Sequence, residues 1–327
     1  MIIDLHSHFL PIEAVQRMPG APVQIENAAN GTFRLTVGHQ KFTLDSRLVD
    51  LDQQRSDMRR QSLDARTLMP PPFTLLYELP AEEGQRWSRT INDGIAEAAR
   101  AFPDELIGFA TVPLQDVPSA VEETKRAVLE LGMRGIEIAT SVDGVGLDDP
   151  GLDPFWGVAE SLRIPILIHP HYVSGASRMG EYHLRNLIGN PAETALAGAR
   201  LLFGGVLERF PELRTILSHG GGALPHLIGR LDHGFSVRPE CRTSATAPIE
   251  HLRKLYFDTI VFDHTTLRHV EEVVGFSQLV LGTDYPFDMS EERPVAFVRD
   301  AGFSDEQASA ILNAGERLLA AAKSDQQ

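Results

Sequence analysis

The first eleven residues, MIIDLHSHFLP (Met1–Pro11), decide how the rest of the chain is interpreted. The apolar run Ile2–Leu5 predicts a β-strand, and His6 and His8 follow it with one residue between them. In an extended chain, residues i and i+2 point to the same face, so both imidazoles can converge on one point. Such convergence usually serves a divalent metal ion, and the alternative is a polar strand end without a ligand.

Short β-like runs alternate with amphipathic helical stretches along the chain, as in parallel β/α folds. A length of 327 residues with 43% hydrophobic residues allows one large barrel or two smaller domains. We predict class α/β, a (β/α)8 TIM-type barrel, as a single domain over residues 1–327. The predicted strands are Ile2–Leu5, Ala65–Met69, Ile107–Thr111, Gly135–Ile138, Ile164–His169, Arg214–Leu217, Leu255–Asp258 and Leu279–Gly282. The predicted helices are Gln85–Ala101, Pro118–Leu131, Pro154–Ser161, Pro191–Phe210, Ala223–Leu231, Thr265–Val274, Glu291–Ala301 and Ser304–Ala322.

The segment from about residue 22 to residue 45 interrupts this alternation. Its sequence VQIENAANGTFRLTVGHQKFTL is typical of antiparallel strands, and Asn30-Gly31 is a favoured hairpin turn. We therefore predict a small antiparallel β-hairpin insert after the first strand, near the mouth of the barrel.

Composition restricts the partners and the location of the protein. With 30 basic and 45 acidic residues the formal net charge is −15, which argues against nucleic acid or an anionic membrane as a partner. An anionic small molecule remains possible if local arginines offset this charge. No apolar run approaches the roughly 20 residues of a membrane span, and the N-terminus has no signal-like segment. A single cysteine, Cys241, excludes an internal disulfide, and we expect a cytoplasmic protein.

Polar residues follow four of the predicted strands. They are His6 and His8 after the first strand, His169 and then His171 after the fifth, His219 after the sixth and Asp284 after the eighth. Active-site residues of β/α barrels gather at the C-terminal ends of the strands. Each residue alone could cap a strand end, but four such ends together favour one metal site. Imidazoles and a carboxylate suit Zn²⁺, with Mn²⁺, Fe²⁺ or Co²⁺ tolerated.

Five segments together resemble the amidohydrolase superfamily. They are IDLHSHFLP (3–11), ILIHPHY (166–172), MGEYHLRNLIGNPAET (179–194), LSHGGGALPHLIGRLDHGF (217–235) and LGTDYPF (281–287). Within the superfamily, the chain is most similar to the subgroup built around 2-amino-3-carboxymuconate-6-semialdehyde decarboxylase. The similarity extends from residue 2 to about residue 320 and includes the hairpin insert.

The resemblance implies a role for each strand-end residue. The metal ligands would be His6, His8, His169 and Asp284, and the catalytic residues would be His219 and Asp284. His219 would lie beside a metal-bound water as acid/base. Dinuclear members of the superfamily often bridge two metals from a lysine on the fourth strand, where this chain has Glu137. We therefore expect one divalent metal and no organic cofactor.

The resemblance also implies substrate-binding arginines and a homodimer. Arg230 would reach into the neighbouring subunit's pocket and hold the substrate carboxylate. An arginine before the second strand has a similar role in the family. Arg55 is the nearest candidate here, with Arg47 and Arg59 close by.

Two positions depart from the pattern of the subgroup. His171 and His183 stand where the subgroup has tryptophans, one after the fifth strand and one over the substrate. Two large aromatic faces are thus replaced by imidazoles. The change favours a different substrate, with His171 and His183 as substrate-binding candidates.

We favour a metal-dependent, non-oxidative decarboxylase of a small unsaturated or aromatic carboxylic acid. That reaction needs a proton for the carbon that loses the carboxylate, and an acid at His219 supplies it. The alternative is a metal-dependent hydrolase or hydratase of a lactone, amide or enol acid, which would use the same residues. A non-enzymatic metal-binding protein is less favoured, because Gly220–Gly222 beside His219 lets a ligand approach the backbone.

Overall fold

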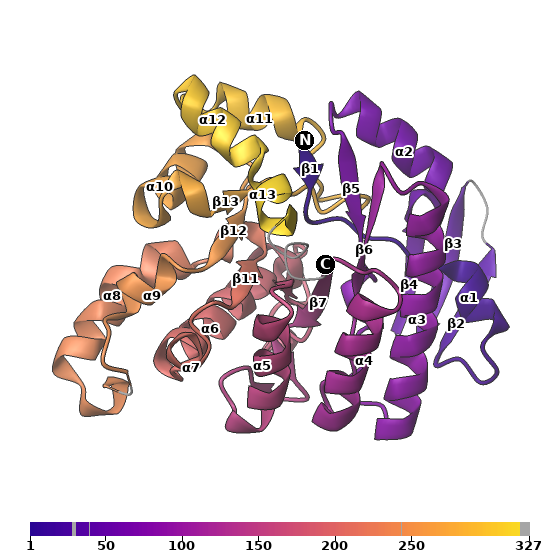
Figure 1. Ribbon diagram of the computed structural model, residues 1–327, viewed down its shortest axis with the longest axis horizontal. Coiled ribbons are helices and arrows are strands. Elements are labelled where there is room, and N and C mark those ends of the chain that lie inside the picture. The colour runs from indigo at the N-terminus through magenta and orange to yellow at the C-terminus, as the bar shows by residue number, and fades with distance from the viewer. Residues whose placement is uncertain (28–30, 39, 243, 321–327) are drawn as a thin grey trace.

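An eight-stranded sheet forms the centre of the protein (Figure 1). The computed structural model describes residues 1–27, 31–38, 40–242 and 244–320. The strand order is β1-β5-β6-β7-β10-β11-β12-β13, and each neighbouring pair is parallel. The bounds are β1 Ile3–Asp4, β5 Ala65–Leu68, β6 Leu106–Ala110, β7 Gly135–Ala139, β10 Pro165–His169, β11 Arg214–Leu217, β12 Tyr256–Asp258 and β13 Leu279–Val280. All eight predicted strands are therefore present, although β1 and β13 are shorter than predicted.

The two ends of this sheet come together beyond the bounds of β1 and β13. The Leu5 N–H donates to the backbone oxygen of Leu281 at 2.9 Å, and Ser7 forms a parallel bridge with Tyr285. The sheet is therefore curled, and the residues that follow its first and last strands lie side by side.

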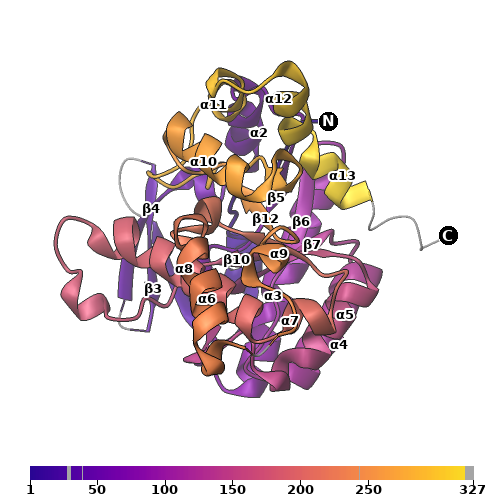
Figure 2. The same cartoon turned by 90° about the vertical axis from the view of Figure 1, so that its left-hand side faces the viewer.

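Helices lie outside this curled sheet (Figures 1 and 2). They are α1 Ile12–Arg17, α2 Leu51–Arg60, α3 Ala81–Ala101, α4 Val117–Leu129, α5 Asp153–Ser161, α6 Asn190–Phe203, α7 Val206–Arg209, α8 Leu224–Val237, α9 Pro248–Leu252, α10 His264–Val274, α11 Pro294–Asp300, α12 Asp305–Leu312 and α13 Ala314–Ala320. Among the described residues, none of these helices combines the length and apolar character needed to cross a membrane.

Two predicted helices are each divided in the structure. The stretch predicted as Pro191–Phe210 forms α6 and α7, because Gly205 between them has a φ of +68° that helices do not accommodate. The stretch predicted as Ser304–Ala322 forms α12 and α13, and its last two residues lie outside the described part of the chain.

Helix α2 was not predicted, and its sequence LDQQRSDMRR shows why. Its buried side chains include the polar residues Gln54 and Asp57, so no apolar stripe marks the helix. Gln54 donates to the backbone oxygen of His8 at 2.9 Å, and Asp57 accepts from the Tyr285 hydroxyl at 2.7 Å. The helix is thus held to the segments after β1 and β13 by hydrogen bonds.

The predicted insert is an antiparallel sheet of three strands in the order β2-β3-β4. The strands are Val23–Asn27, Thr32–Val37 and Gln40–Asp45. The predicted antiparallel insert is therefore present, with one strand more than a simple hairpin has, and Asn30 of the predicted turn lies outside the described residues. Phe42 of β4 stacks on Phe73 with ring centroids 4.8 Å apart, which ties the insert to the loop after β5.

Candidate metal centre

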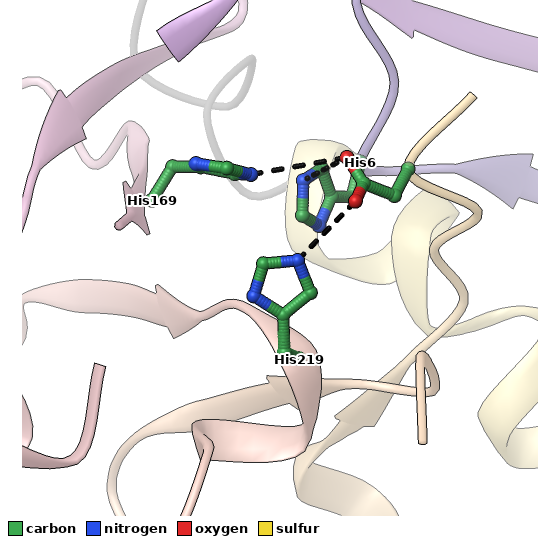
Figure 3. Close-up of side chains that lie close together, drawn as sticks. His6, His169 and His219 are labelled. Carbon is green, nitrogen blue, oxygen red and sulfur yellow. Dashed lines mark hydrogen bonds and ion pairs between the residues drawn. The ribbon is translucent and has the colours of Figure 1, made fainter. Parts of the chain in front are cut away.

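Four imidazoles and one carboxylate converge where the strands of the central sheet end. His6 and His8 follow β1, His169 ends β10, His219 follows β11 and Asp284 follows β13. Ligand atoms of His6, His169, His219 and Asp284 all lie within 4.8 Å of one another, and Figure 3 shows three of these imidazoles directed toward one another. The Nε2 atom of His8 lies 3.1 Å from Oδ1 of Asp284. The structure therefore brings together the five strand-end residues that were predicted as metal ligands or catalytic residues.

The side chains of this cluster fit a divalent metal ion. His6 Nε2 and His169 Nε2 are buried and have no hydrogen-bond partner among the described residues, and they lie 3.4 and 3.8 Å from Asp284 Oδ1. A buried polar atom without a partner costs free energy, and a cation among these atoms would satisfy them. Imidazole nitrogens and one carboxylate are ligands that Zn²⁺ and Mn²⁺ accept.

The outer nitrogen of each predicted histidine ligand is held by a hydrogen bond. The acceptors are Asp258 Oδ2 for His6 at 2.7 Å, the Pro70 backbone oxygen for His8 at 3.2 Å and the Pro170 backbone oxygen for His169 at 2.9 Å. Because these acceptors carry no hydrogen, each Nδ1 is the donor, and Nε2 keeps its lone pair for a metal.

Asp258 is a site residue that the sequence analysis did not identify. Besides His6, it accepts the backbone N–H groups of His219 at 2.9 Å and Gly220 at 2.8 Å. It thereby fixes both the ring of His6 and the backbone that carries His219. Its position at the end of the seventh predicted strand was the available signal.

Two residues of the cluster have left-handed backbones. His219 has a φ of +55° and Asp284 a φ of +61°, a region that costs residues other than glycine about 1–3 kcal/mol when strained. The Asp284 N–H donates to the backbone oxygen of His6 at 2.8 Å, which helps to hold this conformation. Such local strain is typical of functional sites.

The protonation states in the cluster suit metal binding. Burial opposes ionisation of Asp284, but the imidazoles of His169, His219 and His8 around it outweigh burial and hold the pKa of this carboxyl well below its usual range. Burial lowers the pKa of His169 well below its usual value and also lowers the pKa of His8. For His6 the hydrogen bond to Asp258 and nearby carboxylates outweigh burial and raise the pKa. An ionised Asp284 and neutral His8 and His169 are the forms that bind metals, whereas His6 must release its extra proton when a metal binds.

A second carboxyl group, that of Glu137 on β7, is buried next to the cluster. Its Oε1 lies 3.9 Å from His8 Nδ1, and neither of its oxygens has a hydrogen-bond partner among the described residues. Burial, and then the charge of Asp284, raise the pKa of Glu137 well above its ordinary value. The neutral acid is therefore the favoured form at this position.

Two cavities open beside the cluster, and both are lined by Asp284. The larger one, of about 410 Å³, is also lined by His169, His171 and His183. The smaller one, of about 250 Å³, is also lined by His219. The structure therefore places both predicted substrate-binding histidines near the cluster. Burial, and then the charge of Arg185, lower the pKa of His171 to about 4, so this ring is neutral near pH 7.

The arginines predicted to bind substrate lie elsewhere. Arg55 and Arg59 both pair with Glu105 on the outside of α2, and neither lines the two cavities. Arg55 and Arg59 are four positions apart, so they lie on the same face of α2, and this face is turned toward Glu105. The structure thus does not bring Arg55 to the site. Arg47 lies with its guanidinium 5.6 Å from the ring centroid of Tyr285. Arg230 is exposed on α8, away from both cavities of this chain.

A different arginine, Arg185, lines the larger cavity. It lies within the segment MGEYHLRNLIGNPAET, but no spacing rule distinguishes it from other surface arginines. Arg185 was therefore not predicted as a site residue.

Comparisons with known proteins agree with this architecture. The sequence pattern of the amidohydrolase family matches residues 3–314. The chain is 34% identical over 299 residues to 2-amino-3-carboxymuconate-6-semialdehyde decarboxylase of Dictyostelium discoideum, across 89% of this chain and 83% of that protein. It is 29% identical over 267 residues to gamma-resorcylate decarboxylase of Rhodococcus jostii (strain RHA1), across 75% of this chain and 80% of that protein. The solved dihydroxybenzoic acid decarboxylase of Polaromonas sp. JS666, with bound manganese and 2-nitroresorcinol, shares the fold with a TM-score of 0.81 at 21% identity, across 99% and 98%.

Proposed function

Because the chain belongs to the amidohydrolase family, we propose that it is a metal-dependent, non-oxidative decarboxylase of a small unsaturated or aromatic carboxylic acid. The observation that carries this proposal is the convergence of His6, His8, His169, His219 and Asp284 beside the two cavities. The decarboxylases with related sequences support the choice of reaction.

The same proposal includes a closed (β/α)8 barrel as one domain over residues 1–327, with the insert at about 22–45. The hydrogen bond from Leu5 to Leu281 and the bridge from Ser7 to Tyr285 support closure of the sheet. Closure would place the ends of all eight strands around one opening, where the metal cluster lies.

His6, His8, His169 and Asp284 would hold one divalent metal ion. The nitrogen and oxygen donors favour Zn²⁺, and the manganese in the related structure makes Mn²⁺ the second candidate. When bound, the ion would supply a positive charge that attracts and orients the substrate carboxylate or a neighbouring oxygen.

His219 would act as the catalytic acid. Its side chain is 15% exposed and lines the smaller cavity, whereas the side chain of His8 is fully buried. In the reaction, the bond between the carboxylate and its carbon breaks, and its electron pair stays on that carbon. His219 then delivers a proton to the same carbon, and CO₂ leaves. Asp284, whose Oδ2 lies 3.3 Å from His219 Nε2, would orient the imidazole.

We also propose a homodimer in which Arg230 serves the neighbouring subunit. Arg230 lies on α8, which packs beside α6, and both helices expose large apolar side chains. Leu227 is 41% exposed and Leu196 is 50% exposed. Apolar surface of this kind suits a subunit contact. For location, a cytoplasmic enzyme remains our expectation, supported by the free thiol of Cys241.

The proposed reaction can be tested by measuring CO₂ release from a panel of acids by the metal-loaded protein. The panel contains 2-amino-3-carboxymuconate semialdehyde, salicylates and hydroxylated benzoates, and a parallel panel contains lactones, amides and enol acids. Metal-dependent CO₂ release would support decarboxylation. Hydrolysis or hydration without CO₂ from any acid would overturn it in favour of the alternative.

A further inference from the structure

The larger cavity contains a basic side chain with no assigned role, that of Arg185. The cavity extends from His169 and Asp284 of the metal cluster to Arg185. The Arg185 side chain is exposed, and its Nη2 donates a long hydrogen bond of 3.4 Å to the backbone oxygen of His171. Its guanidinium group therefore has most of its donors free to bind an occupant of the cavity.

No carboxylate neutralises Arg185 within the described residues. Other arginines in the protein lie against acids, as Arg126 does against Glu123 with 2.8 Å between the charged atoms. Asp288 lines the same cavity as Arg185, yet the two residues form no ion pair in the described part of the chain. In a protein with a net charge of −15, an arginine left unpaired beside a cavity provides the local positive charge that an anionic ligand needs.

The backbone around Arg185 fixes its place at the cavity. Arg185 begins the π-helix Arg185–Gly189, and His183 before it has a φ of +59°. A Cβ atom on Gly189 would lie 2.5 Å from Val173 Cγ1, so the segment packs closely on the loop after β10. Short π-helices and left-handed residues gather at functional sites, because folds rarely retain them elsewhere.

The same cavity also has an aromatic wall. Phe42, Phe73 and Phe287 all line it. Phe73 and Phe287 have ring centroids 6.3 Å apart, and the centroid of Phe287 lies 5.0 Å from that of His8. A flat, apolar body would pack against such rings, and its polar ends would point to the metal cluster and to the arginine.

We propose that the cavity takes a planar unsaturated or aromatic acid with a second carboxylate, and that Arg185 binds this second carboxylate. The inference rests on the proposed function for the reacting end of the molecule, which lies at the metal cluster. Arg185 then determines specificity: the reacting carboxylate lies at the metal ion and the imidazoles, and the remaining carboxylate forms a charge-assisted pair with the guanidinium. A monocarboxylic acid would leave Arg185 without a partner.

The test uses two probes that differ in one group, 4-hydroxyisophthalate and salicylate, which lacks the second carboxylate. Their binding to the metal-loaded protein is measured by calorimetry, so the result does not depend on turnover. The wild type should prefer 4-hydroxyisophthalate, and Arg185→Gln should weaken its binding by about ten- to a hundredfold. Salicylate binding should change by less than about twofold. Arg185→Lys should recover part of the loss, because it restores charge without the planar fork.

Arg178→Gln is the matched control. Arg178 is an exposed arginine seven positions earlier that does not line either cavity, so its removal changes the net charge equally. The assignment would be overturned if Arg185→Gln weakened the binding of both acids equally, or if Arg178→Gln weakened the binding of the dicarboxylate as much as Arg185→Gln does. It would also be overturned if the wild type showed no preference for the dicarboxylate, including the case in which neither acid binds. If the protein preferred the dicarboxylate in an Arg185-dependent way but released no CO₂ from any acid, only the proposed reaction would be refuted.

Discussion

The Nδ1 atom of His6 lies 2.7 Å from Oδ2 of Asp258, and both side chains are fully buried. Asp258 also holds the backbone of His219, so one carboxylate orients a predicted metal ligand and the predicted catalytic acid. Carboxylates behind ligating histidines fix the tautomer of the ring and raise its basicity. The metal affinity of the site should therefore depend on a residue that does not touch the metal.

Asp258→Asn should weaken metal binding by about 10–100-fold, because the amide no longer offers a charged acceptor to His6. The affinity can be measured by competition with a chromogenic chelator. Asp263→Asn is the control, since Asp263 caps α10 with a 2.7 Å bond from Thr266 N–H. Equal affinities in wild type and Asp258→Asn would rule out this positioning role.

His219→Ala should retain the metal but lose turnover by about 10²–10⁴-fold, the range for removal of a general acid. The reason is that Nε2 of His219 is the proposed proton donor, while His6, His8, His169 and Asp284 suffice to bind the ion. Elemental analysis and CO₂ release on the same sample separate the two effects. Unimpaired turnover would remove the acid role, and loss of the metal would make His219 a ligand.

Glu137→Gln should stabilise the metal-free protein, and more so as the pH rises. The folded-state pKa of Glu137 is raised above its unfolded value near 4.5, so the folded protein binds more protons than the unfolded chain above that pH. Its contribution to stability is thus full below pH 4.5 and falls as the pH rises through the folded-state pKa. Gln cannot ionise and avoids this loss. Thermal unfolding of the wild type and the variant, with chelator and from pH 5 to 8, tests the prediction. A difference in unfolding temperature that does not increase with pH would refute it.

Gly222→Ala should destabilise the protein by about 1–3 kcal/mol or more. Gly222 has a φ of +60°, and an added Cβ would lie 2.0 Å from the backbone oxygen of Pro191. Gly229→Ala is the control in α8, where nothing lies within 4 Å, and it should stabilise the helix by up to about 1 kcal/mol. Urea unfolding gives both values. Similar stabilities for the two variants would contradict the packing argument.

Hybrid dimers test whether Arg230 acts across the subunit contact. Arg230→Ala and Asp284→Ala should each be inactive alone, since each lacks one part of every site. Mixing after mild dissociation should restore about a quarter of wild-type activity, because about half of the dimers are hybrids with one complete site each. A mixture as inactive as its components would leave Arg230 without a role in trans.

The strands and the convergence of the candidate metal ligands were predictable from sequence for the same physical reason. Short β-branched runs mark buried parallel strands, and the carboxyl ends of such strands meet at one edge. His6, His169 and Asp284 follow strands far apart in the chain, yet their ligand atoms lie within 4.8 Å of one another. Local pattern and topology together were enough here.

Residues that depend on unpredicted elements could not be placed. Arg55 lies on α2, whose buried Gln54 and Asp57 conceal the helical period, so its outward direction was not visible in the sequence. Asp258 resembled any strand-end carboxylate until the fold brought it to His6. Arg185 lies on a π-helix, which no sequence rule anticipates.

The measurement that tests the central claim most directly is the metal content of the purified protein, determined by elemental analysis beside the His169→Ala variant. We predict about one divalent ion per chain in the wild type and a large loss in the variant, because His169 Nε2 is one of the buried atoms without another partner in the described part of the chain. A wild-type protein that binds no divalent ion, even after incubation with Zn²⁺ or Mn²⁺, would contradict it.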